Sequence, residues 1–323
     1  MTFKNLSFKR KASGGKVALP AVRGFDISGK MTLAEYTSKI GSLGFQASEL
    51  AKGITLLKEM KSDKATVFLS FTSNIISSGL RELVAQLCRE KAVQCIITST
   101  GAIEEDYMKS KAPFLMGSFD VDDEEIKKKA LNRIGNVLVP DKYYVDLEQF
   151  NLKFIAELYK TSRVVSPSVY CRELGKKITD KNSFLYWAAK NNIPVYAPGF
   201  VDGAIGDHVF FFNQDKKSGE KLIVDQAGDL TSFYNLMLTS DKTGGLIIGG
   251  GIAKHHLIGA AILRNGLDYA VYLSTGTQYD GSLSGARPSE AVSWNKLKDK
   301  KKSAFIEAEA TLVIPLLCLG LLG

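Results

Sequence analysis

Short apolar runs typical of buried strands alternate with stretches of helical periodicity through most of this 323-residue chain. Strands are predicted at residues 65–71, 93–97, 194–196, 208–212, 222–224, 246–248, 269–273 and 304–307. Helices are predicted at residues 32–60, 78–91, 144–160, 183–191, 230–238, 253–265 and 289–298. Strands and helices in turn need crossover connections, so the pattern predicts an α/β fold whose parallel sheet has helices on both faces. Ligands of such folds bind beyond the carboxyl ends of the strands, so the residues after each run are the first candidates for a site.

No linker or internal repeat divides the chain, and we expect a single domain over residues 22–323. The first 21 residues are basic and show no apolar periodicity, so they are predicted to be an extension of that domain. The apolar end of the chain, residues 312–323, is too short to cross a bilayer and contains Pro315. We expect it to form a buried terminal helix or a subunit contact.

The chain carries 42 Lys and Arg against 34 Asp and Glu, a net charge of +8 that raises the question of an anionic partner such as nucleic acid. No basic–aromatic pattern of a nucleic-acid-binding module is present, so we expect no nucleic acid. No apolar run reaches the roughly 20 residues that span a bilayer, so no membrane association is expected. Four Cys without C-x-x-C spacing predict no disulfide framework and no metal site, and favour a reducing compartment, the cytoplasm.

Small and polar residues follow three of the predicted strands. Gly249, Gly250 and Gly251 stand between a strand and a helix, where they suit either phosphate binding or a plain tight turn. Ser73 and Asn74 follow residues 65–71, and Ser99 to Gly101 follow residues 93–97. Their hydroxyls and amides suit ribose or phosphate contacts, or ordinary capping of the next helix.

The three His residues are His208, His255 and His256. The last two are neighbours on one predicted helix and point about 100° apart, so only one can face a site. They lack the i, i+4 spacing of a zinc-binding pair, so we expect no metal site at these residues.

Two further segments carry candidate groups. Asp202 and Asp207 lie in a Gly-rich loop, where they either form turns or hold cationic or hydroxylated ligand groups. Glu290 and Trp294 are spaced i, i+4 on a predicted helix and could bracket an organic cation. Lys296 beside them is a nucleophile if it is neutral, or else a solvated lysine in a Lys-rich stretch.

Several segments together resemble one family. GGGIAKHH, RNGLDYAVY and DGSLSGARPSEAVSWNKLK, with VRGFD, TSNIISSGLREL, IEEDYMKS and VDGAIGDHVFFF upstream, resemble the deoxyhypusine synthase family in order and spacing. The resemblance extends from Val22 to Pro315. It implies a Rossmann-like, NAD-binding α/β subunit in a homotetramer, with active sites at dimer interfaces that draw on both subunits.

The resemblance also implies a reaction and roles. NAD takes a hydride from spermidine, and a lysine holds the 4-aminobutyl group as an imine and passes it to a lysine of a translation factor precursor. By position Lys296 is that covalent lysine and His255 faces the reacting carbon, where it could move a proton. The residues that match amine-binding positions are Glu104, Asp207, Glu290 and Trp294. Those that match dinucleotide positions are Ser73, Asn74, Ser99, Thr100, Gly101, Glu105, Asp202, Gly249, Gly250, Gly251, Thr275, Gly276, Asp280, Ser284, Ala308 and Glu309.

The chain departs from the family pattern at a few positions. Leu283 replaces an acidic residue that contacts the polyamine, Glu309 replaces an Asp beside the adenosine ribose, and VSWNK stands for the usual VSWGK. Two alternatives therefore stay open. One is a homospermidine synthase-like enzyme that transfers the aminobutyl group to a free polyamine. The other is an inactive regulatory paralogue in a mixed tetramer, against which the retained Lys296 and His255 argue.

Overall fold

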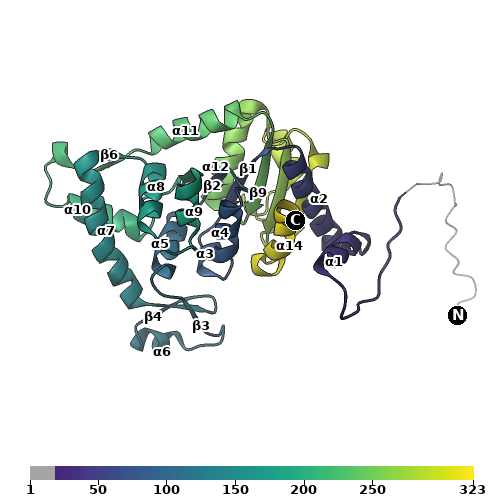
Figure 1. The fold of residues 1–323 in the computed structure, drawn as a ribbon, viewed down its shortest axis with the longest axis horizontal. Coiled ribbons are helices and arrows are strands. Elements are labelled where there is room, and N and C mark those ends of the chain that lie inside the picture. Colours follow the sequence, from purple (N-terminus) through teal and green to yellow (C-terminus); the bar gives the residue numbers. More distant parts are fainter. Residues whose placement is uncertain (1–18) are drawn as a thin grey trace, which may run out of the picture.

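Six strands form one parallel sheet in the computed structural model of the protein, which describes residues 19–323 (Figure 1). In chain order they are β1 (Thr66–Phe71), β2 (Cys95–Ile97), β7 (Val195–Tyr196), β9 (Thr243–Ile248), β10 (Tyr269–Ser274) and β11 (Ser303–Glu307). Their order across the sheet is β7-β2-β1-β9-β10-β11, with every neighbouring pair parallel. Counted along the chain this is the order 3-2-1-4-5-6 of doubly wound dinucleotide-binding folds. The predicted α/β fold with a parallel sheet is confirmed.

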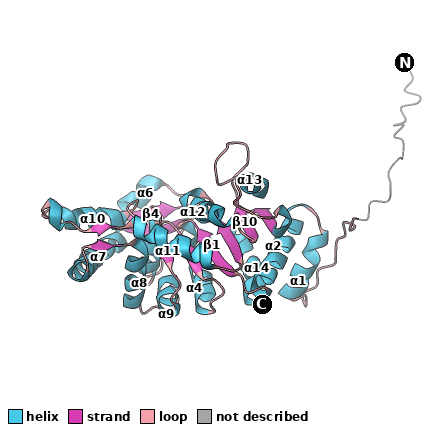
Figure 2. Ribbon diagram, turned by 90° about the horizontal axis from the view of Figure 1, so that it is seen from above, coloured by secondary structure: helices cyan, strands magenta, loops and turns pink. Residues whose placement is uncertain are grey.

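Side chains alternate between the two faces of the sheet and form two apolar cores. Val67, Leu69 and Phe71 of β1 belong to one core, and Phe68 belongs to the other. Helices cover both faces (Figure 2). The first core includes α2 (Phe45–Ser62), α4 (Arg81–Arg89), α9 (Phe184–Asn191) and α14 (Ala310–Leu322), and the second includes α11 (Gln226–Thr239) and α12 (Gly251–Ala261). Because the strands are buried on both sides, they appear in the sequence as continuous apolar runs.

The remaining elements extend or flank this sheet. The helices are α1 (Leu33–Lys39), α3 (Asn74–Ser77), α5 (Thr100–Lys109), α6 (Asp123–Lys128), α7 (Asp141–Thr161), α8 (Pro167–Lys177), α10 (Ala204–Asn213) and α13 (Pro288–Ser293). Strands β3 (Leu115–Met116), β5 (Val137–Pro140) and β4 (Leu131–Ile134) make a small antiparallel sheet, and β6 (Val164–Val165) pairs with β8 (Ile223–Val224). Helices α7 and α10 pack together at the end of the molecule away from α1 (Figure 1).

One strand prediction is wrong, and one predicted strand lies outside the main sheet. Residues 208–212 belong to helix α10, which buries Ile205 and His208 and leaves Phe210 and Phe211 exposed. A short apolar run does not distinguish a strand from a helix, and the burial at i, i+3 is helical. Residues 222–224 do contain β8, but it pairs with β6 outside the main sheet. The β3-β5-β4 sheet was not predicted, because its strands are short and poorly buried.

The apolar end of the chain is the predicted buried helix. Helix α14 contains Pro315 and buries Val313, Leu317 and Leu321 against α2. The predicted extension, residues 1–21, lies almost entirely outside the described residues, and its boundary stays a prediction. Within residues 19–323, no helix is long and apolar enough to cross a membrane.

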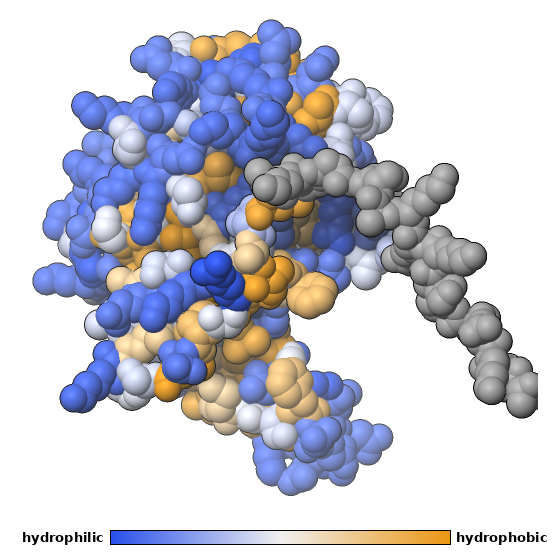
Figure 3. Space-filling model, turned by 90° about the vertical axis from the view of Figure 1, so that its right-hand side faces the viewer, coloured by the Kyte–Doolittle hydropathy of each residue, from blue (hydrophilic) through white to orange (hydrophobic). Residues whose placement is uncertain are grey.

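The surface explains where much of the positive charge resides. Lys298, Lys300 and Lys301 are exposed near the start of β11, and Lys298 pairs with Asp268. The face at the α1 end is mostly hydrophilic, with apolar side chains in scattered groups (Figure 3). The charge of this lysine run is therefore solvated.

Gly320 allows α14 to approach α2 closely. A Cβ at this position would lie 2.6 Å from Leu57 Cβ and 2.7 Å from the Ile54 carbonyl oxygen. We expect Gly320→Ala to lower the free energy of unfolding by about 1–3 kcal/mol, since overpacking forces the two helices apart. Urea unfolding measures the change. Gly219→Ala, where a Cβ would meet no atom within 4 Å, is the control, and equal effects would contradict close packing as the cause.

Candidate functional site

The candidate site begins where β1 and β9 lie side by side. These strands pair along their whole length, from Thr66 with Thr243 to Phe71 with Ile248. The chain turns from β1 to one side of the sheet and from β9 to the other, which opens a crevice at their carboxyl ends. Ser73 and Asn74 follow β1, and the triple glycine follows β9. The strand order therefore brings together two predicted dinucleotide segments about 175 positions apart in sequence.

The glycine turn is sterically specific. Gly249 and Gly251 have φ angles of 80° and 61°, a region that favours glycine. A Cβ on Gly250 would overlap Ser284, and a Cβ on Gly276 would lie 3.0 Å from the Ser284 Cβ. The first turn of α12 starts at Gly251 and leaves backbone N–H groups without partners inside the helix. The turn thus combines a close approach of two loops with free donors for an anion.

Ser73 and Ser99 occupy N-cap positions, but their side chains do not cap the helices. Each precedes a helix, yet neither side chain makes a capping hydrogen bond. The Ser73 N–H instead donates to Ser99 Oγ at 3.1 Å, and a Cβ on Gly101 would lie 3.1 Å from Ser73 Cβ. Thr100 Oγ1 donates to the Gly199 carbonyl at 3.1 Å. The loops after β1, β2 and β7 therefore meet, as a ligand-binding edge requires.

Helix α5 buries three consecutive acids with different partners. Glu104 accepts the Ile205 N–H at 2.8 Å, and burial raises the pKa of its carboxyl, with Asp207 and Asp202 adding repulsion. Glu105 accepts the Ser77 hydroxyl at 2.5 Å, and burial raises its pKa to about 7. Asp106 pairs with Arg81 at 2.6 Å inside the core. Glu104, Asp202 and Asp207 are called the acidic cluster below.

The two neighbouring histidines have different surroundings. His255 is exposed near the start of α12. A residue that faces a substrate must be exposed in this way. His256 stacks on Phe233 with 4.8 Å between ring centroids. Burial, together with His255, lowers the pKa of His256 to about 4. His208 is buried in α10 beside the Asn151 amide, at 2.9 Å, so it packs rather than faces the crevice.

The helix predicted at residues 289–298 is shorter than expected. Helix α13 ends at Ser293, and Trp294 is its C-terminal cap. Asn295 then takes a left-handed conformation with φ of 52°, and the Lys296 N–H donates to the Ala291 carbonyl at 2.8 Å. This reversal still leaves Glu290, Trp294 and Lys296 around one small cavity. The Lys296 Nζ lies 5.4 Å from the Trp294 ring centroid.

The same cavity contains residues that the sequence did not single out. Lys254 and Tyr272 line it together with Leu283. Lys254 directly precedes His255 in the KHH segment. The sequence alone does not indicate that this lysine side chain is buried. We refer to this cavity as the lysine cavity.

The other predicted dinucleotide residues follow β10 and β11 at the same edge. Thr275 comes directly after β10, and Ala308 directly after β11. Asp280 is exposed and accepts the Ser282 N–H at 2.7 Å. Glu309 caps α14, with its Oε2 accepting the Leu312 N–H at 3.2 Å. One carboxylate oxygen of Glu309 is thus engaged by its own helix.

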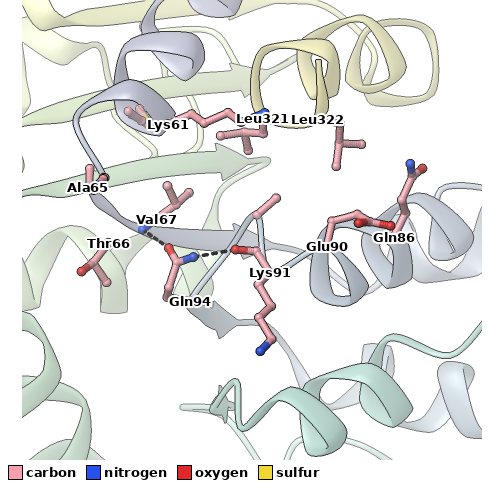
Figure 4. A pocket seen from close by; sticks show the side chains of 13 residues that line it. Lys61, Ala65, Thr66, Val67, Gln86, Glu90, Lys91, Gln94, Leu321 and Leu322 are labelled. Carbon is pink, nitrogen blue, oxygen red and sulfur yellow. Dashed lines mark hydrogen bonds between the residues drawn. The ribbon is translucent and has the colours of Figure 1, made fainter.

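The acidic cluster and the lysine cavity are separate in one subunit. No hydrogen bond or ion pair joins them within residues 19–323. A different cavity, of about 590 Å³, lies at the amino end of β1 beside Lys61, Thr66 and Gln94 (Figure 4). It is lined by none of the predicted site residues and is on the opposite edge of the sheet. Among the described residues, no group of three or more His, Cys, Asp or Glu could hold a metal ion.

Comparisons with known proteins decide the family. The family model for deoxyhypusine synthase matches residues 35–321. The chain belongs to the deoxyhypusine synthase family. It is 44% identical over 304 residues to a "Probable deoxyhypusine synthase" of Halobacterium salinarum, covering 93% of this chain and 92% of that protein. A protein of the same name from Schizosaccharomyces pombe is 38% identical, with 89% and 86% covered.

A solved structure agrees with this membership. The crystal structure of an Entamoeba histolytica protein assigned to deoxyhypusine synthase is 26% identical, with a TM-score of 0.68. It covers 93% of this chain and 96% of that one. Membership in this family implies an enzyme of the transferase type.

The pKa of His256 predicts a pH-dependent stability. Its pKa is lowered on folding, so its contribution is present above the unfolded value of about 6.5 and is lost as pH falls toward 4. We expect His256→Phe to keep the stack on Phe233 and to remove about 2 kcal/mol of the fall in unfolding free energy between pH 6.5 and 4. Urea unfolding across this range measures the slope. His255→Phe is the control, and the same change in that variant would contradict the assignment.

The left-handed residue before Lys296 gives a second test. Asn tolerates this conformation better than other non-glycine residues, which explains how VSWNK substitutes for the usual VSWGK. We expect Asn295→Ala to cost about 1 kcal/mol of unfolding free energy and Asn295→Gly to cost nothing. Equal stabilities of the two variants would show that the conformation at residue 295 does not limit the turn.

Proposed function

We propose that this chain is a deoxyhypusine synthase that works in the cytoplasm. It transfers the 4-aminobutyl group of spermidine, with NAD, through an imine on Lys296 to one lysine of a translation factor precursor. The observation that carries the proposal is the lysine cavity, where a lysine, a carboxylate and an indole meet beside the loop that contacts the glycine turn. The four cysteines are free and buried, in keeping with a reducing compartment.

The crevice suits a nicotinamide dinucleotide. The glycine turn at the start of α12 has the shape and the free N–H donors that a phosphate needs. Ser73, Ser99 and Glu105 would hold ribose or amide groups on one side of it, and Ser284 on the other. When bound, the dinucleotide would supply the acceptor for a hydride from the amine substrate.

The residues in and near the lysine cavity have different proposed roles in binding and catalysis. The Glu290 carboxylate attracts an ammonium group, and the face of Trp294 adds cation–π attraction. Lys296 attacks the imine carbon as a neutral amine. His255, exposed at the first turn of α12, is available to move a proton at the reacting carbon.

The separation of charges supports a proposal for the assembly. In one subunit the lysine cavity has one carboxylate, Glu290, beside Arg287 and two lysines, so it lacks the negative charge that would hold a polyamine. The acidic cluster has the complementary charge. Apolar side chains are exposed beside it, with Val201 59% and Phe210 60% exposed. We therefore propose that the acidic cluster of one subunit completes the lysine cavity of another, in a homotetramer with active sites at dimer interfaces.

A second candidate function rests on Leu283. This side chain lines the lysine cavity where the family has an acid that contacts the polyamine. Loss of one charged hydrogen bond would weaken binding of the ammonium by roughly 1–3 kcal/mol. A homospermidine synthase-like transfer to a free amine is therefore the alternative to transfer to a protein.

One labelling experiment separates these functions. Purified protein is incubated with NAD and spermidine labelled in its aminobutyl group, with and without the precursor protein, and then treated with borohydride. We expect label on the precursor and a trapped adduct on Lys296. Label on putrescine or another free amine instead would establish the second function. Neither label nor adduct would contradict catalysis by this chain, as expected of a regulatory paralogue.

Lys296→Ala tests the nucleophile. We expect at least a 1,000-fold loss of transfer, because covalent catalysis is removed, with NAD binding retained. Lys300→Ala, at an exposed lysine four positions away, is the matched control and should transfer at the wild-type rate. Retained transfer in Lys296→Ala would overturn the assignment.

A further inference from the structure

Lys254 is a buried lysine without a carboxylate partner. Only 2% of its surface is exposed, and its Nζ donates to the Leu283 carbonyl at 2.6 Å and to the Ala286 carbonyl at 3.0 Å. The same Nζ lies 5.1 Å from the centroid of the Tyr272 ring. Within residues 19–323 it forms no ion pair. Burying an amine without an ionic partner costs stability, which makes Lys254 a candidate for a function.

The hydrogen bonds of Lys254 match its neutral form. A neutral amine has two N–H donors and one lone pair, and the two carbonyls use both donors. An ammonium would have a third N–H without an acceptor among the described residues. In the neutral amine, the lone pair is therefore not used by these two hydrogen bonds.

The surroundings of Lys254 make its neutral form more accessible than that of an ordinary lysine. Burial is the main cause that lowers its pKa, to about 8. Glu290 on α13 opposes the shift, while Arg287 and Lys296 add to it. Arg287 is itself paired with Glu307 of β11 at 2.7 Å. Near neutral pH the residue can thus exist in both forms.

Tyr272 is a second unassigned group in the cavity. Its phenol oxygen is buried on β10 and has no hydrogen-bond partner in the part of the chain that the structure describes. This hydroxyl belongs to a residue that lines the same cavity as Lys254 and Lys296, and it leaves a buried polar position there without a partner. A cavity built only for packing would not retain it.

We propose that Lys254 is the proton acceptor for Lys296, a role that rests on the proposed function. The proton leaves Lys296 Nζ and joins the lone pair of Lys254 Nζ. Lys296 then forms an N–C bond to the substrate imine carbon, the C=N electron pair moves to the substrate nitrogen, and that nitrogen takes a proton from Lys296. The proton held by Lys254 joins the same nitrogen as its bond to carbon breaks. The products are the released amine and a protonated imine on Lys296, with Lys254 neutral again.

Two variants separate proton transfer from support of the loop. Lys254→Arg keeps a donor for the Leu283 and Ala286 carbonyls but cannot accept a proton, and Lys254→Met does neither. The readout is the rate of the borohydride-trapped adduct on Lys296, with NAD and spermidine, from pH 6 to 10. We expect the wild-type rate to rise through about pH 8, and the Lys254→Arg rate at pH 8 to be at least 100-fold lower. NAD affinity should stay within about threefold of wild type, and Lys300→Met is the control.

A Lys254→Arg rate and pH profile equal to those of wild type would overturn the inference, because the loop contact alone would then suffice. Carbon-13 NMR of the lysine side chains in the wild-type protein gives a readout independent of the variants' folding. A Cε signal that titrates near pH 8 and is absent in Lys254→Arg supports the role. A Lys254 signal that titrates only above pH 10 overturns it while the proposed function stands. Absence of any adduct in the wild type overturns the proposed function, and the role of Lys254 with it.

Discussion

The parallel pairing of β1 with β9 is the constraint on which the rest of the structure depends. It joins the first half of the sheet to the second, and it places the loop after Phe71 next to the loop after Ile248. The strand order reverses across this pair, so the helices that follow β1 and β9 cover opposite faces of the sheet, and folds of this kind bind ligands in the crevice between them. The predicted dinucleotide residues Ser73 and Asn74, the glycine turn and the start of α12 lie at the ends of these two strands. A change of register between β1 and β9 would move the loop after β1 away from the glycine turn after β9.

The second organising contact joins this crevice to the lysine cavity. Ser284 sits against Gly250 and Gly276, and one residue earlier the Leu283 carbonyl accepts a hydrogen bond from Lys254. One loop thus contacts the glycine turn before α12 through the Ser284 side chain and Lys254 of α12 through its backbone. The two parts of the candidate site therefore share one loop.

Much of the fold was predictable because strands buried on both faces stand out as apolar runs. The residues 65–71, 246–248 and 269–273 all fall in the central sheet. The run at 208–212 was mistaken for a strand, since an amphipathic helix with exposed Phe210 and Phe211 has the same local composition. The short sheet of β3, β4 and β5 left no such pattern, because its stability comes from pairing rather than burial.

The sequence by itself determined the fold class, the family and the types of group at the strand ends, because periodicity and motif spacing are local properties of the chain. Tertiary structure alone decided which of those groups meet. It showed that α13 stops before Trp294, that Asn295 reverses the chain to bring Lys296 back, and that His256 packs while His255 is exposed. Burial of Lys254, and with it the low pKa of that residue, arises only when α12 packs under the loop from residue 283 to 286. Burial and hydrogen-bond partners are set by residues far apart in sequence, and no local pattern encodes them.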